Sequence, residues 1–280
     1  NSGGGFVPAL FYTALPGLRV DATNPRAVLI IVHGLAEYAG RYQSIMEQLA
    51  LGGISSIACD QRGHGAAPGT RTHVDRFDDF VDDLALLIRA VHSTQPQLPV
   101  FVWGHSMGTI VALLAATDPH PSIRGVITTS NSLEVFRRGI NPLNPLFRFL
   151  SWLVPRARIP LGLDSTKIST DESVQRAYAT DPQIPPTASL RLIVEFAAAC
   201  EAAREGAKSI GLPWLIVHGE EDAIAPAEGS RVLFRELAST DKQLEIYPGL
   251  RHEVHNEVPA ARERFIQLLS QWILQRSAAS

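Results

Sequence analysis

The sequence predicts an α/β fold with a mostly parallel central sheet, helices on both faces and an inserted helical cap. Short apolar runs, rich in β-branched residues, alternate along the chain with longer segments of helical periodicity. The runs contain no polar alternation, which is typical of strands that are covered on both faces. The alternation stops between residues 131 and 209, where no strand pattern is visible. These three observations indicate one layered domain that is interrupted by an insertion.

Six apolar runs are predicted as strands and three segments as helices. The strands cover residues 28–32, 54–58, 100–103, 125–129, 214–217 and 243–247. Apolar residues recur three and four positions apart over residues 77–91, where the aspartates between them face outward. Residues 110–116 are almost wholly apolar, which favours a buried helix, and residues 265–273 form a closing amphipathic helix.

We expect residues 1–130 and 210–280 to form the α/β core and residues 131–209 to form the cap. Within the cap, residues 143–154 carry large apolar side chains and no acidic residue. Two interpretations of this segment are open. It makes transient contact with a lipid surface, or it packs down on the sheet and closes a pocket.

The composition excludes several classes of protein. A chain of 280 residues that is 45% hydrophobic is too apolar to be disordered, and a net charge of -3 does not favour a nucleic-acid partner. Two cysteines are too few for a disulfide framework, and the nine histidines are not spaced as zinc ligands. We therefore expect no metal and no cofactor, and the sequence does not reveal the oligomeric state.

No apolar stretch approaches the roughly 20 residues that a membrane-spanning helix needs. The chain starts with Asn1-Ser2-Gly3-Gly4-Gly5, which contains neither a methionine nor a signal pattern, so a signal removed upstream stays open. We expect a protein that is cytoplasmic or peripheral to a membrane, and secretion is left open on the same ground.

A candidate nucleophile follows the third predicted strand. Gly104-His105-Ser106-Met107-Gly108 has the pattern Gly-x-Ser-x-Gly and lies between a strand and a helix. The serine of such a motif sits on a tight, strained turn that lifts its hydroxyl above the sheet, and side chains at the flanking positions would collide. This context predicts that Ser106 is a catalytic serine.

An acid and a base are expected on the loops after the last two strands, because hydrolases of this architecture present serine, acid and histidine in that order. Glu220, Glu221 and Asp222 follow the fifth strand, and His252 and His255 follow the sixth. The acid would orient the imidazole, which would take the proton of the serine. The pattern alone leaves the choice among these acids and histidines open.

Four segments together resemble the monoacylglycerol lipase and lysophospholipase branch of the α/β-hydrolase superfamily. They are His33-Gly34-Leu35-Ala36-Glu37-Tyr38-Ala39-Gly40-Arg41-Tyr42, Asp60-Gln61-Arg62-Gly63-His64-Gly65, the motif around Ser106, and residues 252–257. Their spacing extends over nearly the whole chain after the first 25 or so residues. The resemblance implies the α/β-hydrolase fold.

Carried over residue by residue, the resemblance makes Ser106 the nucleophile, Asp222 the acid and His252 the base. Glu221 is the second choice for the acid, Glu134 the third because some hydrolases place the acid after the preceding strand, and His255 is the rival base. The family's oxyanion hole falls on the backbone amides of Leu35 and Met107.

In monoacylglycerol lipases the positions of Glu37, Arg41 and His255 line the polar end of the pocket, beside the glycerol hydroxyls. The alternative for Glu37 and Arg41 is a simple ion pair at the surface. The sequence departs from the family at Tyr38, where a histidine is common, and at Thr109, where a glycine is common. Tyr38 would alter the alcohol pocket, whereas Thr109 lies outside the serine motif.

The resemblance implies a serine ester hydrolase that cleaves acyl esters of glycerol through an acyl-enzyme intermediate. Its partner would be a small, lipid-like acyl ester. The alternatives are a carboxylesterase, peptidase or thioesterase of the same fold, since one triad serves all of them. A third interpretation is a ligand-binding protein that has the hydrolase scaffold without its activity.

Overall fold

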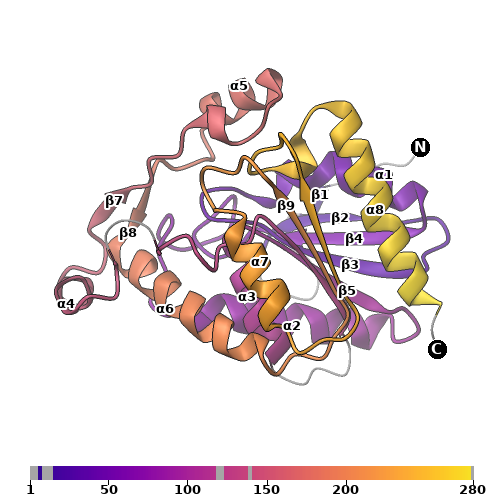
Figure 1. The fold of residues 1–280 in the computed structure, drawn as a ribbon, viewed down its shortest axis with the longest axis horizontal. Coiled ribbons are helices and arrows are strands. Elements are labelled where there is room, and N and C mark those ends of the chain that lie inside the picture. The colour runs from indigo at the N-terminus through magenta and orange to yellow at the C-terminus, as the bar shows by residue number, and fades with distance from the viewer. Residues whose placement is uncertain (1–5, 8–14, 118–122, 138–140, 279–280) are drawn as a thin grey trace.

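The computed structural model describes residues 6–7, 15–117, 123–137 and 141–278. Its core is a sheet of eight strands in the order β1-β2-β4-β3-β5-β6-β9-β10 (Figure 1). The strands are β1 (Phe6–Val7), β2 (Gly17–Val20), β3 (Ala27–Val32), β4 (Ile54–Cys59), β5 (Val100–His105), β6 (Ile123–Thr129), β9 (Trp214–Gly219) and β10 (Lys242–Tyr247). The glycine-rich start at residues 1–5, noted in the sequence, lies outside the described residues.

The sheet is mostly parallel, as the continuous apolar runs predict. All pairings from β4 to β10 are parallel, and β2 runs antiparallel to both β1 and β4. All six predicted strands are confirmed within a residue or two at each end. The antiparallel edge was not predicted, because the four residues of β2 form too short a run to give a strand pattern.

Helices cover both faces of the sheet (Figure 1). On one face, α2 (Asp78–Thr94), α3 (Met107–Thr117), α6 (Leu190–Ala207) and α7 (Glu228–Glu236) pack against alternate strand residues such as Ile30. On the other face, α1 (Gln43–Leu51) and α8 (Pro259–Ser277) pack against the residues between them, such as Leu29. Strands whose two faces are both covered in this way explain why the predicted runs are apolar throughout.

Residues 131–209 leave the sheet after β6 and return to it at β9. They contain α4 (Pro145–Leu153), α5 (Glu172–Thr180), α6 and two short strands, β7 (Arg158–Pro160) and β8 (Thr187–Ser189), which pair antiparallel. The expectation of no strand in this stretch is therefore wrong. Strands of three residues that contain or adjoin prolines give no apolar run for a sequence to reveal.

The helices of this stretch have different environments. Side chains of α6 such as Phe196, Ala199 and Ala203 share one buried cluster with Ile110 and Leu113 of α3, so α6 packs on the sheet layer. By contrast, α4 buries only Ser151 and lies at the far left of the molecule in Figure 1. The division into core and cap stays a prediction. No helix in the described part of the chain is long and apolar enough to span a membrane.

Candidate active site

Ser106 occupies a strained turn between β5 and α3. Its φ is +52°, a left-handed conformation that a residue with a side chain rarely adopts. A Cβ on Gly104 would lie 2.3 Å from the Gly108 carbonyl oxygen, and one on Gly108 would lie 2.1 Å from that of Val32. Both flanking glycines are therefore required sterically, as the motif predicts.

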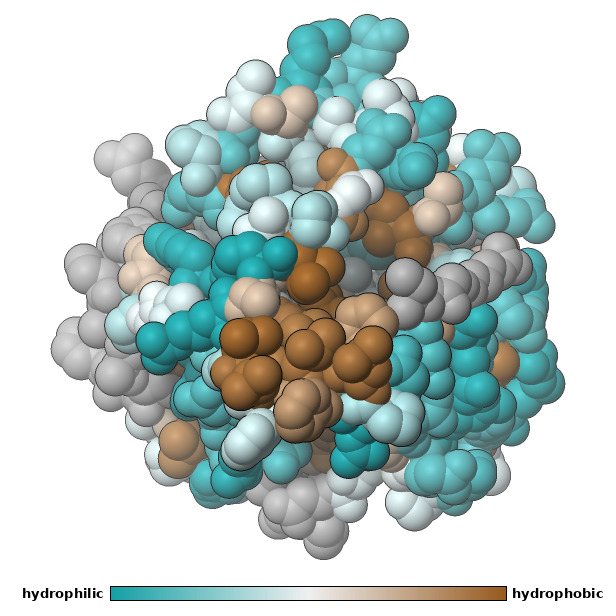
Figure 2. All heavy atoms as spheres, turned by 90° about the vertical axis from the view of Figure 1, so that its left-hand side faces the viewer, coloured by the Kyte–Doolittle hydropathy of each residue, from teal (hydrophilic) through white to brown (hydrophobic). Residues whose placement is uncertain are grey.

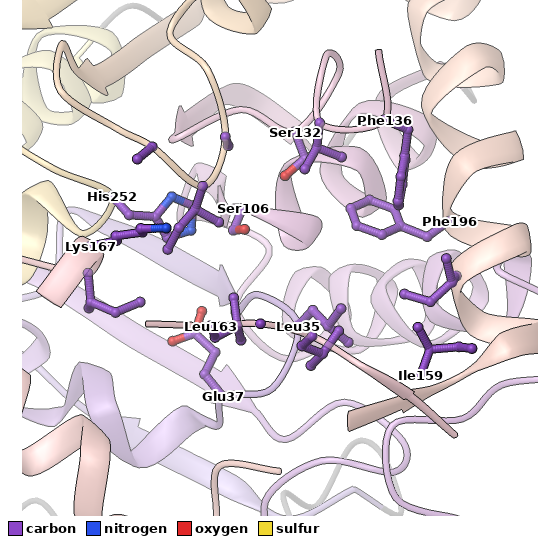
Figure 3. Close-up of a pocket in the computed structure, with 18 of the residues that line it drawn as sticks. Leu35, Glu37, Ser106, Ser132, Phe136, Ile159, Leu163, Lys167, Phe196 and His252 are labelled. Carbon is purple, nitrogen blue, oxygen red and sulfur yellow. The ribbon is translucent and has the colours of Figure 1, made fainter. Parts of the chain in front are cut away.

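His252 and Asp222 meet on the loops after β10 and β9. The imidazole Nδ1 donates to Asp222 Oδ2 over 2.7 Å, and both residues are buried. This bond places the proton on Nδ1 and leaves Nε2 as the basic nitrogen. Ser106 and His252 line the same cavity, and Figure 3 shows their side chains at the same end of it. The serine, the histidine and the aspartate thus come together from three loops.

A second histidine holds Asp222 from the other side. His218 Nε2 lies 2.8 Å from the Ala225 carbonyl oxygen and 3.1 Å from Asp222 Oδ2. Since a carbonyl only accepts, Nε2 carries the proton, and Nδ1 accepts from Ser230 Oγ at 2.7 Å. Asp222 Oδ1 accepts from the amides of Ile224 and Ala225 at 2.8 and 2.9 Å. No pattern in the sequence predicts this role of His218.

These contacts set the charge states of Asp222 and His252. Burial alone would raise the pKa of Asp222, but the charge of His252 and the hydrogen bonds from both histidines hold it well below its usual value. Burial alone would lower the pKa of His252, yet the neighbouring Asp222 raises it above its usual value. A histidine that accepts a proton from a serine needs a raised pKa and an ionised carboxylate beside it, and His252 has both.

The rival candidates lie elsewhere. Glu134 pairs with Arg204 at 3.1 Å, and Glu220 and Glu221 are exposed. His255 is fully buried, stacks on Tyr42 with ring centroids 5.0 Å apart, and has no hydrogen-bond partner on either nitrogen in the described structure. Burial lowers the pKa of His255 to about 3. It does not line the cavity, so it lies outside the polar end of the pocket where the resemblance places it.

The loop after β3 closes around the serine turn. A Cβ on Gly34 would lie 3.0 Å from the Cβ of Ser106, so this loop approaches the serine as closely as its glycine allows. Leu35 lines the cavity beside Ser106, and Met107 is the fully buried first residue of α3. His33 donates from Nδ1 to the Gly34 carbonyl at 2.8 Å and accepts at Nε2 from the Gln61 amide at 2.9 Å, which anchors the loop.

The polar end of the cavity is a buried network of charges. Arg41 reaches both Glu253 oxygens, at 2.5 and 2.7 Å, and its NH1 lies 3.2 Å from Glu37. Glu37 also accepts from Tyr42 at 3.0 Å and from the amide of Gly34. Since Glu37 and Glu253 are 3% and 2% exposed, the alternative of a surface ion pair does not describe this arrangement.

Two buried carboxylates that share one guanidinium cannot both ionise easily. Burial raises the pKa of Glu37 to about 7, in opposition to the attraction of Arg41. For Glu253, burial acts in the same direction, but its paired bonds from Arg41 hold its pKa below the usual value. The network therefore titrates near neutral pH, at Glu37.

A cavity of about 450 Å³ extends from Ser106 away from this network. Most of its lining is apolar, with Phe136, Ile159 and Phe196 at the end opposite His252 in Figure 3. Further apolar residues complete the wall: Val135, Pro142, Phe147, Leu161, Leu163, Ile168, Leu190 and Ile193. Most of these residues belong to the stretch 131–209. A cavity of this size and lining suits a flexible apolar chain that is attached to a polar reacting group.

One rim of the cavity is tied to the histidine loop. Fully buried Glu257 accepts from the Thr170 amide at 2.8 Å and from the Arg251 amide at 2.8 Å. Ser169 donates to the Asn256 carbonyl at 2.9 Å, and Arg251 reaches the Ser169 carbonyl at 3.0 Å. The resemblance marked Glu257 as part of a motif but gave it no role. Glu257 ties the histidine loop to Thr170, which lies 87 positions earlier in the chain, so no local sequence pattern predicts this contact.

The chain matches the family described as Serine aminopeptidase, S33 over residues 23–259. It is 33% identical to a monoacylglycerol lipase of Mycolicibacterium smegmatis, over 84% of each chain, and 29% identical to a monoglyceride lipase of Rattus norvegicus, over 92% of this chain and 85% of that one.

Solved structures give the same result. A monoacylglycerol lipase of Paleococcus ferrophilus superposes with a TM-score of 0.81 at 29% identity, over 92% of this chain and 98% of that one. A monoglyceride lipase of Saccharomyces cerevisiae, solved with a substrate analogue, superposes with a TM-score of 0.86 at 25% identity, over 100% and 97%. The predicted α/β-hydrolase fold is confirmed, and the chain belongs to the serine aminopeptidase S33 family of α/β-hydrolases.

Proposed function

We propose that this protein is a serine ester hydrolase of the monoacylglycerol lipase type, which cleaves acyl esters of glycerol. Ser106 is the nucleophile, His252 the general base and then the general acid, and Asp222 the group that orients and charges the imidazole. The amides of Leu35 and Met107 stabilise the oxyanion, a contribution that is typically worth about 3 kcal/mol for each donor.

The reaction proceeds in two steps. Ser106 attacks the ester carbonyl while His252 Nε2 takes its proton and passes it to the leaving glycerol oxygen. Water then attacks the acyl-enzyme, again with His252 as the base, and releases the fatty acid. Glu37 and Arg41 form the polar wall beside the glycerol. Tyr38, expected from the sequence to alter this pocket, does not line the cavity, and its hydroxyl donates to Asp181 at 2.7 Å. We do not assign substrate contact to His255, which is buried away from the cavity.

The observation that carries the proposal is the two-ended cavity. Ser106 and His252, whose imidazole is hydrogen-bonded to Asp222, lie at its polar end, and its long apolar end is closed by residues of 131–209. Two relatives that are 33% and 29% identical to this chain over most of its length bear the names monoacylglycerol lipase and monoglyceride lipase. A carboxylesterase of small acids would have no use for the apolar end.

The activity is tested with monoacylglycerols and p-nitrophenyl esters of increasing chain length, beside thioesters and aminoacyl anilides. We expect glycerol esters of medium or long acids to be the best substrates, with acetyl esters turned over far more slowly. Equal turnover of acetyl and decanoyl esters, or a preference for the anilides, would overturn the lipase proposal. Ser106→Ala should abolish both turnover and labelling by a fluorophosphonate; a protein that keeps both would refute the mechanism.

We also propose that α4 makes transient contact with a lipid surface. It exposes a patch formed by Leu146, Phe149, Trp152 and Leu153, which are 56–69% exposed (Figure 2). Asn144 caps this helix by accepting from the Phe147 amide, so the patch stands on an ordered element. Arg148 within α4 and Arg156 just after it are exposed, and residues 141–163 contain no acid. An apolar face with cations beside it suits an anionic bilayer.

Sedimentation with vesicles tests this contact. We expect binding to vesicles that contain phosphatidylglycerol, weaker binding to phosphatidylcholine alone, and loss of binding in Phe149→Ser/Trp152→Ser. The matched control is Leu86→Ser, which removes an exposed leucine from α2 on a different part of the surface. Binding that survives the double substitution would show that α4 is not the contact.

A further inference from the structure

Ser132 is a polar side chain without a partner on the wall of the apolar cavity. It follows β6 and is 2% exposed, yet its hydroxyl makes no hydrogen bond within the described residues. Its carbonyl oxygen is occupied, because it accepts from the Val135 amide at 3.1 Å and from the Cys200 thiol at 3.5 Å. Its hydroxyl oxygen is not among the closed-off polar atoms and so is reached from the cavity, where a polar atom of a ligand can pair with it. An apolar ligand that displaces its water would leave the hydroxyl without a partner.

Most other polar groups on the cavity wall have partners or are hydrated. Glu37, Arg41 and Glu253 bind one another, and His252 binds Asp222. His105 pairs with Thr129 Oγ1 at 3.0 Å. Lys167 is exposed at the rim, where water hydrates its ammonium group. Among the described residues that line this cavity, two buried side chains besides the nucleophile keep hydrogen-bonding capacity for a ligand, Tyr178 and Ser132. Tyr178 packs its ring under the guanidinium of Arg41, 5.0 Å from the ring centroid, at the polar end, so Ser132 is the one that faces the acyl chain.

The position of Ser132 relative to the nucleophile is fixed by one side chain. Thr109 donates from Oγ1 to the Ser106 carbonyl at 2.6 Å, and the same oxygen accepts from the Ser132 amide at 3.4 Å. Glycine, which the family resemblance leads one to expect at position 109, has no side chain to make this link. Figure 3 shows Ser132 on the wall between Ser106 and the aromatic pair Phe136 and Phe196. An acyl chain bound to Ser106 that extends toward those rings passes Ser132 within its first few carbons.

We propose that Ser132 selects acyl groups that carry a hydroxyl close to the ester carbonyl, with β-hydroxyacyl esters as the preferred class. The hydroxyl of Ser132 both donates and accepts, so it pairs with a substrate hydroxyl in either direction. A plain chain leaves Ser132 buried and unpaired in the complex, which penalises that substrate. The proposal rests on the proposed ester hydrolysis and adds to it a rule for the acid component.

The test compares two probes, monodecanoylglycerol and its β-hydroxydecanoyl counterpart, in one kinetic assay. We expect the parent protein to favour the hydroxylated ester about five-fold in kcat/KM, the change that one neutral hydrogen bond supports. In Ser132→Ala the ratio should fall to about one or below, because the hydroxylated chain then meets an apolar wall. Ser132→Cys, which keeps the size but bonds weakly, should give an intermediate ratio.

The matched control is Ser239→Ala. Ser239 is also 2% exposed, but it donates to the Asp241 carbonyl at 3.2 Å, away from the cavity, so its removal should leave the ratio unchanged. A parent ratio of one, or a ratio that Ser132→Ala leaves unchanged, would overturn this inference while decanoyl hydrolysis still supported the ester hydrolase. If Ser132→Ala slowed both probes equally, Ser132 would serve a common step and the selectivity rule would be wrong. Failure to hydrolyse either probe would instead contradict the proposed function.

Discussion

The two ends of the cavity are built on opposite principles. At the polar end, Glu37, Arg41 and Glu253 saturate one another, and each has a defined partner at a defined distance. At the apolar end, Phe136, Ile159 and Phe196 enclose space by packing, with no directional bond among their side chains. Packing tolerates graded change, whereas a saturated network of charges fails when one member is removed. The polar end should therefore respond to substitution abruptly and the apolar end gradually.

The most severe change is expected at Asp222. Asp222→Asn should lower kcat about 10⁴-fold, because the amide no longer holds His252 in the tautomer that leaves Nε2 basic. Since Asp222 raises the pKa of His252, the residual activity should also extend to lower pH than in the parent. The measurement is the pH profile of kcat/KM. Glu221→Gln, which changes the exposed neighbouring acid, is the control; equal losses in both variants would contradict this assignment.

Arg41→Gln tests whether the polar network is held by its one cation. Two buried carboxylates would be left without it, so we expect the free energy of unfolding to fall by about 3–5 kcal/mol near neutral pH. The loss should shrink as the pH falls and the carboxylates take up protons. Urea unfolding at several pH values measures it. Arg276→Gln, at a pair with Asp241 whose carboxylate is half exposed, should cost under about 1 kcal/mol.

Glu37→Gln isolates the titrating member of the network. The pKa of Glu37 is raised to about 7 from an ordinary value of 4.5, so between these values the folded protein holds a proton that the unfolded chain has released. The stability from this group is complete below pH 4.5 and is lost as the pH rises to 7. The neutral amide should flatten the dependence of the unfolding free energy on pH. At alkaline pH the variant should therefore gain roughly 1–3 kcal/mol of stability relative to the parent. The measurement is urea unfolding at several pH values. If the unfolding free energies of variant and parent changed with pH in parallel, Glu37 would not be the titrating group.

The smallest effect is expected at the apolar end. Phe136→Leu enlarges the space beside Phe196, so we expect the preferred acyl chain to lengthen by one or two carbons, with activity changed by less than about five-fold. Stability should fall by no more than about 1.5 kcal/mol, because the residue is only partly buried. A chain-length series of monoacylglycerols measures the shift. An abrupt loss of activity toward every chain length would erase the contrast between the two ends.

Much of the fold could be predicted because the central strands are buried on both faces and their runs are therefore apolar throughout. The antiparallel β2 and the amphipathic α1 and α7 could not, since each is short and depends on tertiary packing for its stability. The loops that carry Ser106, Asp222 and His252 were predicted from local motifs. The bond between Arg41 and Glu253 joins residues 212 positions apart, and no local pattern predicts such a contact.

The tether through Glu257 makes the mouth of the cavity asymmetric. The rim that contains Ile168 is bonded to the loop of His252, including a bond from the Glu253 amide to the Ile168 carbonyl at 2.8 Å. That rim cannot swing outward without carrying the base away from Ser106. By contrast, α4 buries only Ser151, and no hydrogen bond among the described residues joins it to the loops of Ser106, Asp222 or His252. A displacement of α4 would therefore leave the catalytic loops in place, whereas a displacement of the Ile168 rim would move the base.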